Sequence, residues 1–303
     1  MEQAAAAAEK LGLLDRVRDY DLMDEPGMPS LTEMAKHDFY QEGFRHYLQE
    51  AGLSPGEVLP TNALAAATPA SEQDLWDKVR LATDEDARRN PALYYHSMVY
   101  RARAFTDFYG AITRMVEQRF GPEVRTFVNI SPSDMQFGPP MGHGVDWFEL
   151  HRRRGLTRAW SEDWIENLPT ASPEWTAYLI DLLRAATRDT AAHGGVGNYT
   201  ICSVDYACEP LWMRLKAYAA LSRGSQELIF YSQGENRPLP GRPILDDYEM
   251  MAEVKQVTYE IGGVEDYLLG ARPEPGQVGI LWSQTTDIWD TAGARGDPYE
   301  EGL

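Results

Sequence analysis

From residue 124 onward, short apolar runs of strand length alternate with longer segments whose apolar residues recur at helical spacing. The apolar runs predict strands over 124–130, 156–160, 199–204 and 227–231. The segments between and after them predict helices over 146–154, 173–186, 210–221 and about 246–267. Strands that alternate with helices favour a parallel sheet with right-handed crossover connections.

The first part of the chain shows the same pattern with a longer interruption. An alanine-rich helix over 1–14 precedes a short strand, which Pro26-Gly27 ends because proline lacks a backbone N–H and glycine permits turn dihedrals. A helix over 30–52 then opens with a capping box. An irregular excursion over 52–74 follows, and Asn90-Pro91 caps a long helix that ends at Gly121-Pro122.

The composition is that of a globular protein, and the net charge argues against some classes of partner. The 303 residues are 43% hydrophobic and 25% charged, which is ordinary for a folded domain. A net charge of −19 argues against nucleic acid and anionic membrane as partners. No apolar run approaches the roughly 20 residues of a membrane-spanning helix. The start of the chain lacks the pattern of a signal peptide, and the compartment, cytoplasmic or secreted, stays open.

Polar and acidic residues follow each expected strand. The strand ends carry Asp24-Glu25, Asn129, Glu162-Asp163-Trp164, Asp205-Tyr206 and Gln233-Gly234-Glu235. In parallel α/β folds these ends share one edge, where active sites are built. Carboxylates and amides bind sugar hydroxyls, aromatic rings stack on sugars, and a carboxylate pair can cleave a glycosidic bond. A solvated acidic turn at 24–25 is the simpler alternative, but the recurrence over five strands favours a carbohydrate site.

Other chemistries lack their motifs in this sequence. There is no G-x-G-x-x-G after a strand, no phosphate-binding Walker loop and no G-x-S-x-G elbow. The six histidines show no metal-binding spacing, and we expect neither a metal nor a cofactor. Cys202 and Cys208 flank Asp205 without an evident basic neighbour, so buried structural thiols are expected there.

A series of segments, taken in order over nearly the whole chain, carries a family resemblance. They are Met23–Gly27, Phe44–Leu53, Asn90–Leu93, Thr126–Asn129, Val145–Trp164, Ala177–Arg184, Tyr218–Tyr231 and Val278–Trp282. Each motif is weak by itself, but their order resembles that of the family 42 glycoside hydrolases, the clan A retaining β-galactosidases.

The resemblance implies an α/β fold that is part of a (β/α)₈ TIM barrel. Residues 1–272 would supply strands four to eight, with Met1 near the third helix of the barrel. Residues 273–303 would be a linker and the first strand, Val278–Trp282, of a second, trimer-forming α/β domain. The chain would then be a fragment of a homotrimeric parent, with three further β/α units encoded upstream.

The resemblance also implies roles for individual residues. Glu25 would be the acid/base and Asp205 the nucleophile, with Glu209 as the alternative nucleophile. The residues expected to bind the sugar are Asn129, Glu162, Trp164, Tyr231 and Gln233. The sequence departs from the family in carrying Asp205 instead of a glutamate and in lacking the zinc-binding cysteines. A carbohydrate-binding relative without catalysis, or an open doubly wound domain of other function, are the alternative readings.

Overall fold

The computed structural model of the chain describes residues 1–59, 71–130, 140–163, 173–188, 190, 196–201, 209–231, 248–274 and 276–293. The chain forms two compact units. The first unit contains Met1–Pro26, Phe108–Gln136 and Trp147–Ile280, and the second contains Gly27–Asp107, Phe137–Asp146 and Leu281–Leu303. Mixed α/β structure is therefore confirmed, with the strands in the first unit and helices in both.

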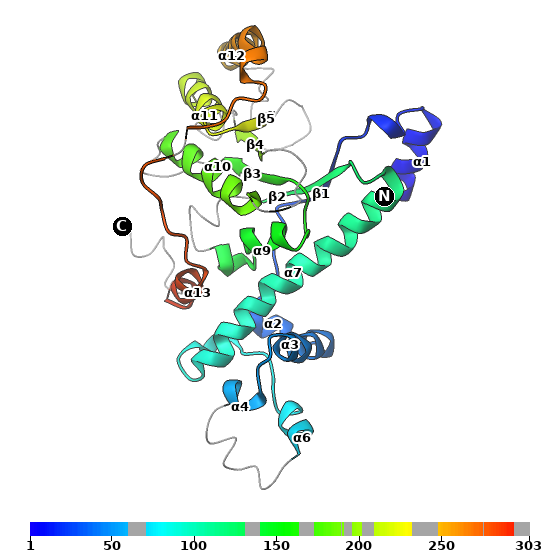
Figure 1. The fold of residues 1–303 in the computed structure, drawn as a ribbon, viewed down its shortest axis with the longest axis vertical. Coiled ribbons are helices and arrows are strands. Elements are labelled where there is room, and N and C mark those ends of the chain that lie inside the picture. The colour runs from blue at the N-terminus through cyan, green and yellow to red at the C-terminus, as the bar shows by residue number, and fades with distance from the viewer. Residues whose placement is uncertain are drawn as a thin grey trace. The chain divides into compact units, whose positions relative to one another are not determined.

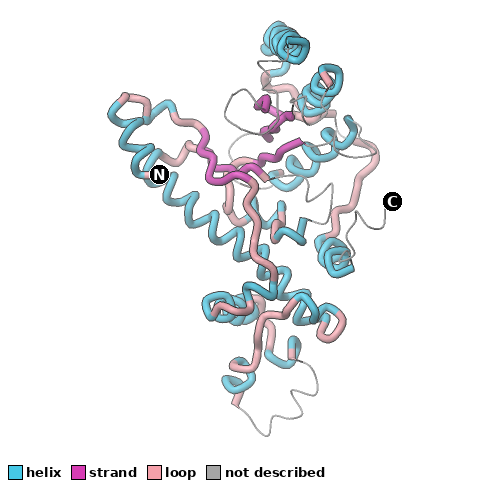
Figure 2. The backbone as a smooth tube through the Cα atoms, turned by 180° about the vertical axis from the view of Figure 1, so that it is seen from behind, coloured by secondary structure: helices cyan, strands magenta, loops and turns pink. Residues whose placement is uncertain are grey.

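The parallel strands described in the first unit form a two-stranded and a three-stranded sheet, which backbone hydrogen bonds connect edge to edge (Figure 2). They are β1 (Asp19–Asp24), β2 (Arg125–Asn129), β3 (Ala159–Asp163), β4 (Val196–Ile201) and β5 (Ser225–Tyr231). Ladders join β1 to β2, β3 to β4, and β4 to β5. Between β2 and β3, the N–H of Arg158 donates to Thr126 O (3.1 Å) and that of Glu162 to Ile130 O (3.2 Å). The strand order thus follows the chain, with no reversal.

Helices cover one face of this sheet (Figure 1). The helices of the first unit are α1 (Glu2–Lys10), η1 (Leu14–Arg16), the end of α7 (Pro91–Phe120), α9 (Trp147–Arg152), α10 (Pro173–Thr187), α11 (Pro210–Ser222) and α12 (Tyr248–Leu268). Helix α10 packs on β3 and β4, α11 packs on β4 and β5, and α12 packs on α11. Leu228 and Phe230 of β5 pack against a buried cluster from α11 and α12.

The other face of the sheet carries an ion-pair network centred on Arg158, whose side chain is only 1% exposed. Its Nη1 lies 2.7 Å from Asp19 Oδ1 on β1, and its Nη2 lies 2.6 Å from Glu227 Oε2 on β5. In a flat sheet β1 and β5 would be four spacings, or about 19 Å, apart. Because one guanidinium reaches both carboxylates, the sheet curls strongly around this face.

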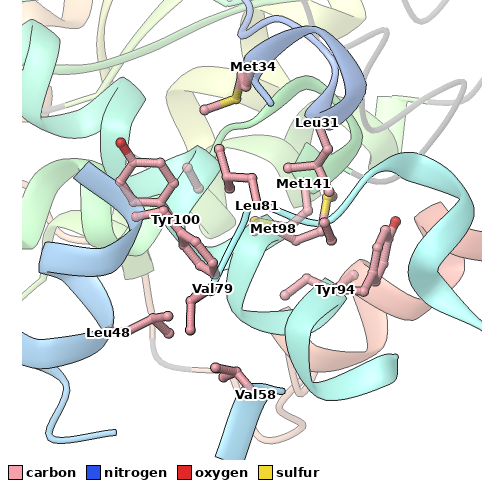
Figure 3. Packing of buried hydrophobic residues seen from close by; sticks show 14 of the residues in the cluster. Leu31, Met34, Leu48, Val58, Val79, Leu81, Tyr94, Met98, Tyr100 and Met141 are labelled. Carbon is pink, nitrogen blue, oxygen red and sulfur yellow. The ribbon is translucent and has the colours of Figure 1, made fainter. Parts of the chain in front are cut away.

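The second unit is helical and has its own core. Its elements are α2 (Leu31–Met34), α3 (Asp38–Glu50), α4 (Pro55–Val58), α6 (Glu72–Trp76), η2 (Asp84–Ala87), the start of α7, η3 (Pro140–His143) and α13 (Gln284–Gly293). Figure 3 shows Leu31 beside Met98 and Met141, and Leu48 beside Val79, in one buried cluster that also contains Tyr100 of α7. Residues distant in sequence therefore share one apolar core.

Local sequence signals explain where several elements begin. Proline stands at the first position of α7, α10 and α11, where its missing N–H costs no helical hydrogen bond. The backbone N–H of Leu93 donates to Asn90 Oδ1, as expected for a cap. The helix expected over 30–52 is instead divided into α2 and α3 by a turn at residues 35–37.

The strand expected over Val278–Trp282 is wrong. Residues 276–283 have no regular secondary structure, and Val278, Ile280 and Leu281 are 87%, 76% and 91% exposed. An isolated apolar run is not stable as a strand without a neighbouring ladder and a face to bury. Helix α13 follows it in the chain.

Within the described ranges of the chain, no helix combines the length and the apolar character needed to cross a bilayer.

Candidate functional site

The ends of β1, β2 and β3 are joined by the side chain of Asn129. Its Nδ2 donates to Asp24 Oδ1 over 2.8 Å and also to Glu162 Oε1. Asn129 and Glu162 are 6% and 3% exposed, whereas Asp24 is exposed. The structure thus brings together two of the residues that the sequence indicated for sugar binding.

The sequence indicates Asp24 only as part of the acidic strand end, with no role of its own at the site. In the structure Asp24 opposes Asn129 in the parallel ladder, after a register irregularity between Asp21 and Asp24. The alternation of side chains along a strand would by itself place Asp21 and Asp24 on opposite faces. The sequence shows the three aspartates of β1 but not the register irregularity between them.

An aromatic pair lies two residues before Asn129 and Glu162 on the same strands. The rings of Phe127 on β2 and Trp160 on β3 have centroids 4.6 Å apart. Each is two residues before its site residue, so period-two alternation puts Phe127 with Asn129 and Trp160 with Glu162 on one face. Asn129 and Glu162 therefore lie next to a packed aromatic pair that restricts their motion.

Glu25 follows β1 with an unusual backbone. Its φ is 43°, in the left-handed region that favours glycine, and its side chain is exposed. Its N–H donates to Asn129 O over 2.7 Å, which holds this conformation. Such a conformation costs a non-glycine residue roughly 1–2 kcal/mol, and residues of this kind cluster at functional sites.

The charge of the site also affects Asp21. Partial desolvation raises the pKa of the Asp21 carboxyl above its ordinary value, and the negative charge of Asp24 adds to this effect. The backbone N–H of Met23, which donates to Asp21 Oδ1 over 3.2 Å, acts in the opposite direction. The end of β1 therefore has a negative electrostatic environment.

Several of the indicated residues cannot be placed. Asp205, Trp164 and Gln233 lie outside the described residues, as does the side chain of Tyr231, which ends β5. Glu209, the alternative nucleophile, stands at the N-cap position of α11. Within the described ranges, no group of three or more His, Cys, Asp or Glu side chains is arranged to hold a metal ion.

No protein-family model matches the chain, and a comparison with curated proteins gives no match. The function is therefore argued from the strand-end geometry. Asp24, Glu25 and Glu162 supply carboxylates, and Asn129 supplies an amide between two of them. Such an edge can accept hydrogen bonds from hydroxyl or amine groups and can transfer protons to a ligand.

Proposed function

We propose that this protein is a glycoside hydrolase of the retaining, β-galactosidase-like type, acting on a β-linked sugar. The observation that carries the proposal is the Asn129-bridged pair of carboxylates beside Glu25, at the carboxyl edge of parallel strands. This edge is where barrel enzymes hold their catalytic residues.

A partial (β/α)₈ barrel, strands four to eight, is the proposed fold of the first unit. The sequential strand order supports it, since an open doubly wound sheet reverses its order at a switch point. The curl that brings Asp19 and Glu227 to one guanidinium also supports it. The described strands do not close into a full barrel.

The proposed mechanism uses two carboxylates with different roles. Glu25 would protonate the leaving-group oxygen while Asp205 attacks the anomeric carbon and forms a glycosyl ester. Glu25, then ionised, would remove a proton from the water that hydrolyses the ester. Asn129 and Glu162 would bind the sugar together with Trp164, Tyr231 and Gln233. This mechanism uses no cofactor.

Hydrolysis of a panel of aryl β-glycosides tests the proposal. Glu25→Ala should slow substrates with poor leaving groups far more than activated ones, and azide should rescue the activated ones. Asp205→Ala should abolish hydrolysis of both. Glu123→Ala, at an exposed position before β2, is the matched control and should keep full activity.

Three outcomes would change the assignment. If Asp205→Ala retains activity and Glu209→Ala loses it, the nucleophile is Glu209. If neither the Glu25 nor the Asp205 variant loses activity, the proposed mechanism is wrong. Binding of sugars without any hydrolysis would instead support the carbohydrate-binding alternative, which the shorter side chain of Asp205 favours.

A further inference from the structure

The apolar seam of helix α12 is longer than the part that α11 covers. Its residues recur at alternating steps of four and three positions, which is the spacing of packed helices, and they are Met250, Val254, Val257, Ile261, Val264 and Leu268. The first three are buried in one cluster with Met213 and Ala217 of α11, and Ile261 packs against this cluster. The last two are 46% and 42% exposed. The seam therefore continues beyond its contact with α11, the helix beside it (Figure 1), and we call residues 264–269 the free end of α12.

Charged residues flank the covered part of the seam and pair across it. Arg214 of α11 contacts Glu253, and its Nη1 lies 2.7 Å from Glu260 Oε2. Each of these glutamates directly precedes a seam residue of α12, and flanking charges of this kind set which helices associate. Glu265 flanks the free end directly after Val264. Among the described residues no lysine or arginine pairs with Glu265, so the free end is apolar and negative at once.

We propose that the free end of α12 binds an amphipathic helix of a partner protein, with apolar residues facing Val264 and Leu268 and with lysine or arginine beside Glu265. Such a helix would extend the packing that α11 begins and would repeat its pairing of basic with acidic residues. Tyr267, 84% exposed on the other flank, supplies an aromatic ring of the kind enriched at protein interfaces. The binding does not depend on the proposed hydrolase activity.

A second copy of this chain fits the free end less well. Two free ends packed together would bring Glu265 and Asp266 of each copy close to the same carboxylates of the other. The net charge of −19 adds a general repulsion between copies. We therefore expect the chain alone to sediment as a monomer. A dimer that the Leu268→Ser variant dissociates would overturn the proposal, because the seam would then be covered by the second copy.

Binding of designed peptides to the full chain, measured by fluorescence anisotropy, tests the chemistry of the partner. The first peptide has about three heptads with leucine at the seam positions and lysine at the flanking positions. The second has glutamate in place of lysine, and the third contains the residues of the first in scrambled order. The first peptide should bind roughly tenfold more tightly than the other two. Equal binding of the scrambled peptide would overturn the proposal, because net charge alone would then be recognised.

Variants of the chain locate the binding site. Leu268→Ser should weaken binding of the lysine-flanked peptide roughly tenfold, because it removes a seam side chain. Leu13→Ser, at a leucine outside α12 with a matching exposure of 41%, should leave the affinity unchanged. Circular dichroism should show both variants folded, because both positions are partly exposed. Equal losses of affinity in the two variants would contradict the proposed site.

The contribution of charge is tested at Glu265. Glu265→Gln should weaken binding of the lysine-flanked peptide by about two- to fivefold at low ionic strength, as for an exposed ion pair. The effect should vanish at 1 M salt, where charges are screened within about 3 Å. Glu249→Gln, at an exposed position at the start of the same helix, is the charge-matched control and should change nothing. An equal effect of the two substitutions would overturn the assignment of a basic flank to the partner helix.

Discussion

Arg158 Nη1 lies 2.7 Å from Asp19 Oδ1, although Arg158 directly precedes β3 and Asp19 begins β1, two strands away. The same guanidinium reaches Glu227 on β5 and lies 5.2 Å from the centroid of the Trp160 ring. Arg158 therefore links β1 to β5 on the face of the sheet that the helices do not cover. Because the guanidinium is buried, its charge depends on these carboxylates for compensation.

Arg158→Leu should strongly destabilise the first unit. Removing one partner from a buried ionic group leaves the other charges uncompensated, and we expect a loss of about 3–5 kcal/mol in the free energy of unfolding. Urea denaturation measures this loss. Arg125→Leu is the matched control, since Arg125 pairs with the same Asp19 but has a 24% exposed side chain. It should cost about 1 kcal/mol or less, and equal losses in both variants would contradict this account.

Replacing Glu25 by glycine should stabilise the protein while removing its activity. Glycine adopts a φ of 43° without a Cβ clash, although it also gains entropy in the unfolded chain, so the net gain should be about 0.5–1 kcal/mol. Glu25→Ala should give no such gain, because alanine keeps the Cβ. Thermal unfolding and glycoside hydrolysis are measured in parallel.

Arg154 provides the comparison for Glu25, since its φ is 55° and its Nη2 pairs with Glu117 over 2.7 Å. Arg154→Gly should leave hydrolysis unchanged. If Glu25→Gly retained wild-type activity, the strained backbone at this position would have no connection with catalysis.

The second unit should become less stable as the pH rises through the range set by Asp287. Burial raises the pKa of the Asp287 carboxyl from 3.8 to about 6, with the charges of Asp290 and Asp146 adding to the shift and the Met141 N–H opposing it. Between these values the folded state binds more protons than the unfolded state, so the free energy of unfolding falls from about pH 4 to pH 6.

Asp287→Asn should therefore raise the free energy of unfolding at pH 7.5 by up to about 3 kcal/mol, at 1.36 kcal/mol per pKa unit, and have no such effect near pH 4. An asparagine Oδ1 can still accept the hydrogen bond that Met141 N donates over 3.0 Å. Chemical denaturation at several pH values checks the difference. Asp290→Asn, at an exposed neighbouring position, should give a smaller gain. A gain that is independent of pH would be inconsistent with this origin.

His151 should give the first unit the opposite pH dependence. Burial lowers the pKa of its imidazole to about 4, and the nearby backbone of Leu156 acts against this shift. The unfolded chain binds a proton near pH 6.5, so the stability is fully present above that pH and is lost as the pH falls toward 4. His151→Leu should flatten this part of the stability profile, whereas His46→Leu, at an exposed helix position, should not. An unchanged slope in the His151 variant would disprove this assignment.

Much of the fold could be predicted because its signals are local. Proline and asparagine at residues 90–91 mark the start of α7, and the apolar run at 227–231 lies within β5. The edge location of Asn129 and Glu162 also followed from the sequence, since the carboxyl ends of neighbouring parallel strands meet at one edge. These predictions needed only backbone propensity, side-chain period and the direction of the strands.

Other features depended on partners that are distant in the chain. The apolar pattern at 278–282 resembles a strand, but a strand needs a neighbour, and the structure places no ladder beside it. The role of Arg158 required Asp19 and Glu227, which are 139 and 69 positions away, to meet on one face. The contact of Asp24 with Asn129 required a register irregularity in β1. The sequence by itself therefore determined which segments form helices and strands and which of them end in carboxylates. Only the tertiary structure decided which charges are buried together, because curvature and register arise from packing between segments far apart in the chain.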